Sequence, residues 1–125
     1  MAKTVFVKLR DAHGVLSRRA VDAIVIPHTR ESLVVHPTWL CDDGGTLDDD
    51  WWSITHFASG KAIKSRLPSK AAAIKVARAF WSELSESSRL MFVTGSGKHF
   101  EVPADRMDDC KQALDRALRL AGLIV

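Results

Sequence analysis

Hydrophobic and polar residues alternate in the first part of the chain, as they do in strands with one buried face. Residues 4–10 (TVFVKLR) show this alternation. Residues 23–27 (AIVIP) and 33–40 (LVVHPTWL) are rich in β-branched residues and are separated by the polar segment HTRES. Two such runs with a short polar connection are typical of a β-hairpin. The pattern therefore predicts an antiparallel sheet made of strands that follow one another along the chain.

Residues 51–67 predict a further hairpin, with a two-residue turn at Ser59 and Gly60 because glycine tolerates the positive φ that such turns require. This register places Trp52 opposite Leu67. Successive side chains of a strand point to opposite faces, so we expect Trp52 to be buried and Trp51 to be exposed. The residues predicted to share the inward face are Trp52, Ile54, His56, Ile63 and Leu67, and those predicted to share the outward face are Ser53, Thr55, Phe57, Ala62, Lys64 and Arg66.

Two later segments repeat their apolar residues at helical spacing. The first covers residues 70–84 and follows Ser69, whose hydroxyl suits an N-cap position. The second begins after Pro103 and ends before Gly122, a residue type that is common just beyond a helix C-terminus. Each helix has one apolar side, so both are predicted to pack on one face of the sheet.

Another hairpin is predicted between these helices, because residues 89–93 and 98–102 read as strands and flank the turn-like TGSG. The order hairpin, proline, helix then occurs twice, in residues 52–84 and 89–121, with Ser-Gly-Lys at both turns. A duplicated ββα unit would explain this, but turns also converge on these residues independently. The fold prediction is a single α+β domain over residues 1–125, with five to seven mainly antiparallel strands and two amphipathic helices on one face.

The composition agrees with one folded domain in a reducing compartment. Of the 125 residues, 46% are hydrophobic and 26% are charged, as in ordinary globular proteins. The two cysteines, Cys41 and Cys110, are far apart and form no CxxC pair, which argues against a disulfide framework or a zinc ribbon. The N-terminus lacks the apolar core of a signal peptide, and no apolar run is long enough to span a membrane. We therefore expect a soluble cytoplasmic protein without a membrane partner.

The net charge of +3 is unevenly distributed along the chain. Five aspartates lie in residues 42–50, whereas no acidic residue occurs from Trp51 to Ser82. Basic groups, hydroxyls and an outward aromatic side chain on one surface suit phosphate contacts and base stacking. The leading hypothesis is therefore a small non-enzymatic module that binds nucleic acid, either RNA or DNA. The residues predicted to make the contact are Trp51, Ser53, Thr55, Phe57, Lys61, Lys64, Arg66, Lys70, Lys75 and Arg78.

Two other interpretations explain the same residues. A half-buried hairpin needs a polar outer face, and lysines protect strand edges from aggregation. Alternatively, the exposed Trp51 and Phe57 form a protein interface, as in a homodimer or in an inhibitor or adaptor of a larger complex of the kind that phage and plasmid genes encode. In that case the acidic loop over residues 42–50 supplies specificity, whereas otherwise it is a solvated turn or a cation site.

The sequence contains no recognised catalytic, cofactor or metal motif. The segment TGSGKH lacks the first glycine, the hydroxyl residue and the following helix of a phosphate-binding loop. No G-x-S-x-G sequence occurs, and no histidine has the spacing of a zinc ligand. His56 lies on the predicted apolar face and is expected to be a hydrogen-bonded core residue, while His28 and His36 flank one turn and give only a weak indication of a metal. We expect neither an enzyme nor a bound cofactor or metal.

The segment SRLPSKAAAIKVARAF resembles the last strand and helix of double-stranded-RNA-binding domains. In that family the helix starts with the pattern Ser-Lys-Lys-x-Ala-Lys, whose lysines hold phosphates. Ser69, Lys70 and Ala73 match the pattern, whereas Ala71 and Ile74 replace its second and third lysines. The helix that this family has ahead of its strands is not evident in the sequence. The resemblance implies a phosphate contact at Lys70 and does not extend to the rest of the chain.

Overall fold

The computed structural model describes residues 3–10, 16–40, 46–96 and 100–124, with side chains described for residues 23–38, 51–96 and 100–124. The strands are β1 (Lys3–Arg10), β2 (Leu16–Val25), β3 (Leu33–Leu40), β4 (Thr46–His56) and β5 (Ala62–Leu67). The helices are α1 (Lys70–Glu83), α2 (Glu86–Thr94) and α3 (Ala104–Leu120). The predicted α+β class and antiparallel pairing are thus confirmed, with one helix more than expected among the described residues.

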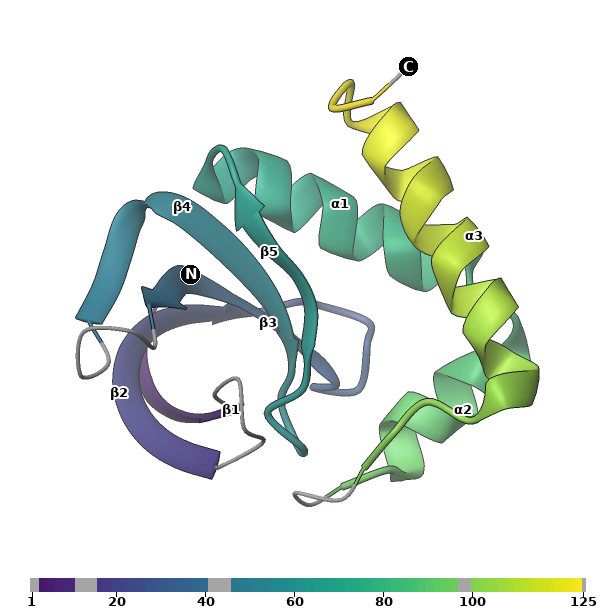
Figure 1. Cartoon of the computed structure of the whole chain (residues 1–125), viewed down its shortest axis with the longest axis horizontal. Helices are drawn as coiled ribbons and strands as arrows, with labels where there is room; N and C mark the ends of the chain where they lie inside the picture. The colour runs from purple at the N-terminus through teal and green to yellow at the C-terminus, as the bar shows by residue number, and fades with distance from the viewer. Residues whose placement is uncertain (1–2, 11–15, 41–45, 97–99, 125) are drawn as a thin grey trace.

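The sheet has the strand order β1-β2-β3-β4-β5, so each strand pairs with its neighbours in sequence. The first part of β2, up to Ala23, pairs with β1, and only Ile24 and Val25 pair with β3. β2 to β5 therefore make a four-stranded sheet that β1 continues, which matches the predicted five to seven strands only in part. Figure 1 shows that the β1–β2 end of the sheet curls away from the helices.

The hairpin of β4 and β5 begins in the predicted register and then departs from it. Trp52 lies opposite Leu67, as expected from the sequence. Further along, Thr55 lies opposite Ala62 and not Lys64, because the register shifts twice between the two strands. Extra residues of this kind bend a strand and strengthen its twist. A strict in-and-out alternation therefore does not describe β5.

The turn of this hairpin is longer than the predicted two residues. The His56 N–H donates to the Lys61 carbonyl over 2.8 Å, so the turn encloses all the residues between them. Gly60 has a φ of +76°, which is the conformation for which glycine was expected there. Arg66, inside β5, also has a positive φ, +59°, in the part of the ladder that is irregular.

The hydrophobic core lies between α1 and one face of β3, β4 and β5 (Figure 1). Leu33, Val35 and Ile54 from the sheet and Ala77 and Phe80 from α1 are all buried there. α3 packs mainly on α1, and its Cys110 and Leu114 line a cavity together with Ile63 of β5. The predicted packing of two helices on the sheet is therefore seen directly for α1, whereas α3 makes most of its contacts with α1.

Serine caps mark the beginnings of α1 and α2. The Ser69 hydroxyl accepts a hydrogen bond from the N–H three residues later over 3.1 Å, which confirms the predicted cap of α1. Ser85 accepts from the Ser88 N–H in the same way and starts α2. Residues 89–93 (RLMFV) have a strand-like composition, but the cap and the burial of Phe92 in the core favour a helix. The hairpin predicted there is therefore wrong, and the duplicated ββα unit is wrong with it.

Parts of two predicted segments lie outside the described residues. The predicted turn TGSGKH is described only up to Ser96, and residues 42–45 of the acidic segment are not described. The remaining acidic residues, in the range 46–50, belong to β4 and not to a loop. Within the described part of the chain, no helix combines the length and the apolar character that crossing a membrane would require.

Candidate functional site

Two of the residues predicted to contact nucleic acid are buried. Ser53 and Thr55 lie on the β4 face that points away from α1, and both are almost inaccessible. The Ser53 hydroxyl lies 2.8 Å from the Thr38 hydroxyl, and the Thr55 hydroxyl lies 2.7 Å from His36 Nε2. The prediction that these two residues are open to solvent is therefore wrong, and their hydroxyls are bonded within the fold.

These four side chains form a buried polar layer, defined as His36, Thr38, Ser53 and Thr55, in which His36 is only 1% exposed. Its Nδ1 lies 2.7 Å from the Pro37 carbonyl. A carbonyl can only accept, so Nδ1 carries the proton and Nε2 accepts from the Thr55 hydroxyl. Burial lowers the pKa of His36, although the hydrogen bond to Pro37 opposes this shift. The imidazole is therefore uncharged at neutral pH, and its hydrogen bonds stabilise the fold.

The two adjacent tryptophans of β4 lie in the environments predicted for them. Trp52 is partly buried and packs against the core, and Lys70 Nζ lies 5.8 Å from the centroid of its ring. Trp51 is 42% exposed. A large aromatic side chain of β4 is thus open to a partner.

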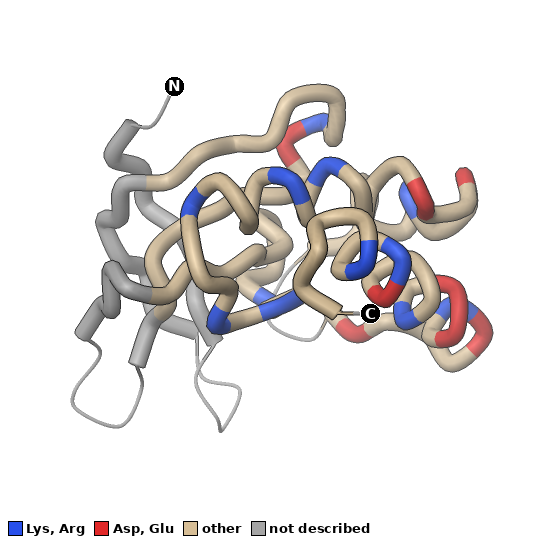
Figure 2. Tube along the Cα trace, turned by 90° about the horizontal axis from the view of Figure 1, so that it is seen from above, with Lys and Arg blue, Asp and Glu red and all other residues tan. Residues whose placement is uncertain are grey.

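Five of the predicted basic residues gather on β5 and α1, and we call them the basic face: Lys64, Arg66, Lys70, Lys75 and Arg78. All of them are exposed except Lys64, which is half-buried. Within the described ranges, none of the five forms an ion pair with an acidic side chain. Among the residues that Figure 2 colours by charge, basic positions lie across the middle of the molecule and most acidic positions lie at the end where α2 and α3 are. The basic face therefore offers free positive charge.

Two other predicted site residues are not free in this way. Lys61 Nζ forms an ion pair with Glu101 Oε2 over 3.0 Å. Phe57 is half-buried, and its N–H donates to the Ser32 carbonyl over 2.9 Å. Of the ten residues predicted from the sequence, the structure thus leaves the five of the basic face without an acidic partner among the described residues and leaves Trp51 exposed.

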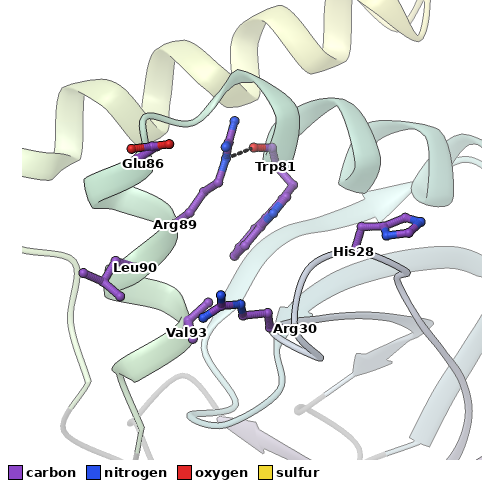
Figure 3. Close-up of a pocket in the computed structure, with 7 residues that line it drawn as sticks. All are labelled: His28, Arg30, Trp81, Glu86, Arg89, Leu90 and Val93. Atoms are coloured by element: carbon purple, nitrogen blue, oxygen red, sulfur yellow. Dashed lines mark hydrogen bonds between the residues drawn. The ribbon is translucent and has the colours of Figure 1, made fainter.

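A cleft that the sequence pattern did not reveal lies beside the basic face. Its walls are the loop between β2 and β3, the end of α1 and one side of α2 (Figure 3). We call it the Trp81 cleft, and its volume is about 230 Å³. The basic residues of HTRES and of RLMFV were visible in the sequence, but only the tertiary fold brings these segments together. The residues that line the cleft are His28, Arg30, Trp81, Glu86, Arg89, Leu90 and Val93.

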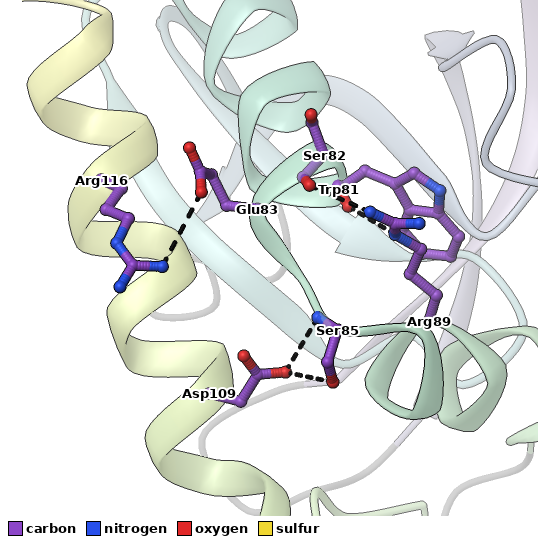
Figure 4. A network of polar contacts seen from close by, with 7 residues as sticks. All are labelled: Trp81, Ser82, Glu83, Ser85, Arg89, Asp109 and Arg116. Carbon is purple, nitrogen blue, oxygen red and sulfur yellow. Dashed lines mark hydrogen bonds and ion pairs between the residues drawn. The ribbon is translucent and has the colours of Figure 1, made fainter.

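Arg89 is fixed between α1 and α2. Its Nε donates to the Trp81 carbonyl and its Nη2 donates to the Ser82 carbonyl, each over 2.9 Å (Figure 4). These carbonyls belong to the last turn of α1, where a helix has unsatisfied acceptors and a partial negative charge. The guanidinium therefore caps α1 and is held at the wall of the cleft with little freedom to move.

The loop between β2 and β3 has a strained backbone. His28, Arg30 and Glu31 have φ values of +66°, +52° and +60°. For a residue other than glycine, this left-handed backbone conformation is less stable than the right-handed one by roughly 1–2 kcal/mol. The buried Thr29 holds the loop, since its hydroxyl donates to the Ile26 carbonyl over 2.8 Å. Strain of this kind persists where the surroundings fix the backbone, and it is common at ligand-binding sites.

Asp109 of α3 holds α2 in place. Its Oδ2 accepts from the Ser85 N–H over 3.1 Å and from the Ser85 hydroxyl over 2.8 Å (Figure 4). It also accepts from the Ser88 hydroxyl over 2.5 Å. The hydrogen bonds from Ser88 and then Ser85 lower the pKa of Asp109, so the carboxylate is charged at the N-terminus of α2, where the helix dipole favours a negative charge. α3 therefore holds in place the helix α2, which forms one wall of the cleft.

The histidines provide no metal site in the described structure. His56 is buried, with Nδ1 2.7 Å from the Ser59 hydroxyl and Nε2 2.6 Å from the Phe92 carbonyl, so its predicted role as a core residue is confirmed. His28 lies exposed in the loop, whereas His36 is enclosed in the buried polar layer. Among the residues that the structure describes, no three or more His, Cys, Asp or Glu side chains are grouped so that they could hold a metal ion.

Comparison with known proteins assigns no family to the chain. No family model, no curated protein and no solved structure matches it. The ligand of the protein has therefore to be inferred from its residues and their geometry.

Proposed function

We propose that the protein is a small non-enzymatic module that binds nucleic acid through the basic face. The observation that carries this proposal is the free positive charge on the neighbouring elements β5 and α1, in a stretch from Trp51 to Ser82 that contains no acidic residue. Contacts between basic side chains and phosphates release counterions and supply most of the affinity in sequence-independent binding. An unpaired basic surface suits this mode of binding because no internal ion pair has to be broken.

α1 presents its charges in an arrangement that suits a phosphate backbone. Lys75 and Arg78 are three residues apart in the helix and so lie on the same side. Lys70 stands in the first turn, where the helix N-terminus adds positive potential and no acidic residue offsets it. The ring of Trp52 lies beside Lys70 and adds an aromatic surface next to this charge. Phosphate contacts and an aromatic surface are therefore close together.

Fluorescence anisotropy with labelled oligonucleotides at two salt concentrations tests the proposal. If four side chains of the basic face contact phosphates of a single strand, a fourfold rise in salt weakens binding by about 50-fold. Lys75→Glu is expected to weaken binding and to reduce the salt slope by about one. Lys111→Glu, which reverses one exposed charge on α3, is the matched control. Absence of binding at low salt, or an equal loss in both variants, would contradict the proposal.

Protein interaction is a second candidate function, and a specific groove favours it. Between α1 and α3 lies a largely apolar groove lined by Ala71, Ile74, Lys75, Arg78, Ala79 and Leu120. Leu120 is 60% exposed, and contiguous exposed apolar surface is typical of protein interfaces, including homodimers. Light scattering separates the two functions, because Leu120→Ser, which adds no charge beside Lys75 and Arg78, would weaken a homodimer that uses this groove and leave binding of oligonucleotides intact.

A further inference from the structure

We infer that the Trp81 cleft holds one unstacked base of a single-stranded nucleic acid, with its phosphate at Arg30 and Arg89. This inference rests on the proposed function, because the basic face carries the rest of the strand. It goes further in naming a single strand as the ligand and in giving its base a defined place.

Trp81 provides a fixed aromatic surface for the base. Its ring packs against the buried Phe92 with a centroid separation of 6.5 Å and an interplanar angle of 49°. The indole is only half-buried, and it lines the cavity between α2 and the loop (Figure 3). A cavity of about 230 Å³ is smaller than the pockets of about 300–1,000 Å³ that hold drug-sized ligands, which fits a group as small as one base.

Arginine and histidine side chains surround the tryptophan. The Arg89 guanidinium uses two N–H groups on carbonyls of α1, and its other N–H groups remain available to a phosphate. Arg30 and His28 come from the loop on the other side of the cleft (Figure 3). Glu86 is the one acidic side chain among the described residues that line the cavity. The cleft therefore favours a ligand that combines a flat ring with negative charge.

The cleft opens onto the basic face. A second cavity of about 700 Å³ shares His28, Trp81 and Arg89 with the first and extends to Arg78 and Ser82. Arg78 belongs to the basic face as well. A strand whose phosphates lie along α1 can therefore reach the Trp81 cleft without crossing an apolar barrier.

A single strand fits this arrangement and a duplex does not. In a duplex the bases are paired and stacked, so extrusion of one base costs a few kcal/mol. In a single strand the base faces are open, and aromatic side chains stack on them regardless of sequence. The Trp81 cleft therefore discriminates against duplexes, whereas the basic face alone would accept both forms.

Probes of equal length test the inference with the full chain. They are an oligothymidine single strand, the same backbone with abasic sites, a DNA duplex and an oligouridine RNA strand. We expect the oligothymidine to bind about tenfold more tightly than the abasic strand, since stacking of one base contributes about that factor. The duplex is expected to bind more weakly than the single strand, and oligouridine to bind as oligothymidine does.

Variants of the cleft locate the base. Arg30→Asn removes a charge and keeps a side chain that tolerates the positive φ, and Trp81→Leu removes the ring and keeps apolar packing against Phe92. Trp81→Leu is expected to lower the affinity for oligothymidine by about tenfold and to change the affinity for the abasic strand less. Arg30→Asn removes a phosphate contact, so it is expected to weaken both probes and to reduce the salt slope by about one. Lys111→Asn on α3 is the matched control. Thermal unfolding reports whether Trp81→Leu folds, and the comparison of the two probes on the unaltered protein keeps the test decisive if it does not.

The outcomes separate the two proposals. Equal affinity for the oligothymidine and abasic strands would overturn the assignment of the cleft to a base, while salt-dependent binding through the basic face would stand. The same holds if Trp81→Leu weakens both probes equally, or if Arg30→Asn weakens neither. Absence of binding to every probe at low salt would instead overturn the proposed function itself.

Discussion

Trp51 and Trp52 show how differently two neighbouring residues of one strand contribute to the molecule. Trp52 packs against the core, and Trp51 is 42% exposed. Trp52→Ala is expected to lower the free energy of unfolding by up to about 3 kcal/mol, because it removes a large and partly buried side chain. Trp51→Ala is expected to change it by less than about 0.5 kcal/mol, as surface substitutions usually do. Urea denaturation of both variants checks this, and similar losses in the two would show that Trp51 supports the fold as well.

His36 leads to a second prediction at the residue scale, which concerns how the free energy of unfolding depends on pH. Burial lowers the pKa of His36 in the folded protein below the ordinary value of about 6.5 that it has when unfolded. Between these two pKa values only the unfolded state binds the proton, so stability is complete above about pH 6.5 and falls as the pH decreases, by at most about 1.4 kcal/mol per pH unit. Urea midpoints measured at pH 7.5 and at lower pH values test this. His36→Gln should flatten the dependence, and an unchanged slope would show that another group causes it.

At the scale of elements, capping was readable from the sequence only where periodicity pointed in the same direction. Ser69 precedes an apolar repeat and was recognised as the cap of α1. Ser85 caps α2 in the same way, but RLMFV reads as a strand by composition. What decides in favour of the helix is tertiary: Phe92 is buried in the core and Asp109 binds the helix N-terminus from α3. These tertiary contacts cannot be inferred from the pattern of a single sequence.

The contact of Asp109 leads to a prediction for α2. Asp109→Asn removes the charge that accepts from Ser85 and Ser88, so we expect a loss of about 1 kcal/mol, the usual value of an N-cap contact. Because the folded pKa of Asp109 is lowered, the contact is complete at neutral pH and is lost when acid protonates the carboxylate. Hydrogen exchange measured by mass spectrometry should show that Asp109→Asn speeds up exchange in α2 more than in α1, relative to the unaltered protein. Asp108→Asn is the control, and equal protection of α2 in both variants would rule out this role.

At the scale of the whole molecule, the sequence predicted the class of fold and the exposed basic residues of β5 and α1, and it missed how the sheet curls. Leu33–Leu40 has the bounds that the pattern predicts, and Lys75 and Arg78 are exposed as expected. Ser53 and Thr55 were taken for surface residues because a flat sheet with helices on one side has an open second face. The sheet curls and these two residues are buried. The Trp81 cleft was missed for a related reason, since it joins three segments that only the fold brings together.

The buried polar layer has a consequence for how the sequence can change over evolution. His36 is bonded to Thr55, and Thr38 to Ser53. Loss of one partner removes this hydrogen bond from a buried polar atom of the other at a cost of about 1–3 kcal/mol, whereas replacement of both by apolar residues of similar shape is nearly neutral. Single substitutions in this layer are therefore selected against, and we expect accepted substitutions to change both bonded partners together. Positions 36 and 55, and positions 38 and 53, should covary among the descendants of this gene.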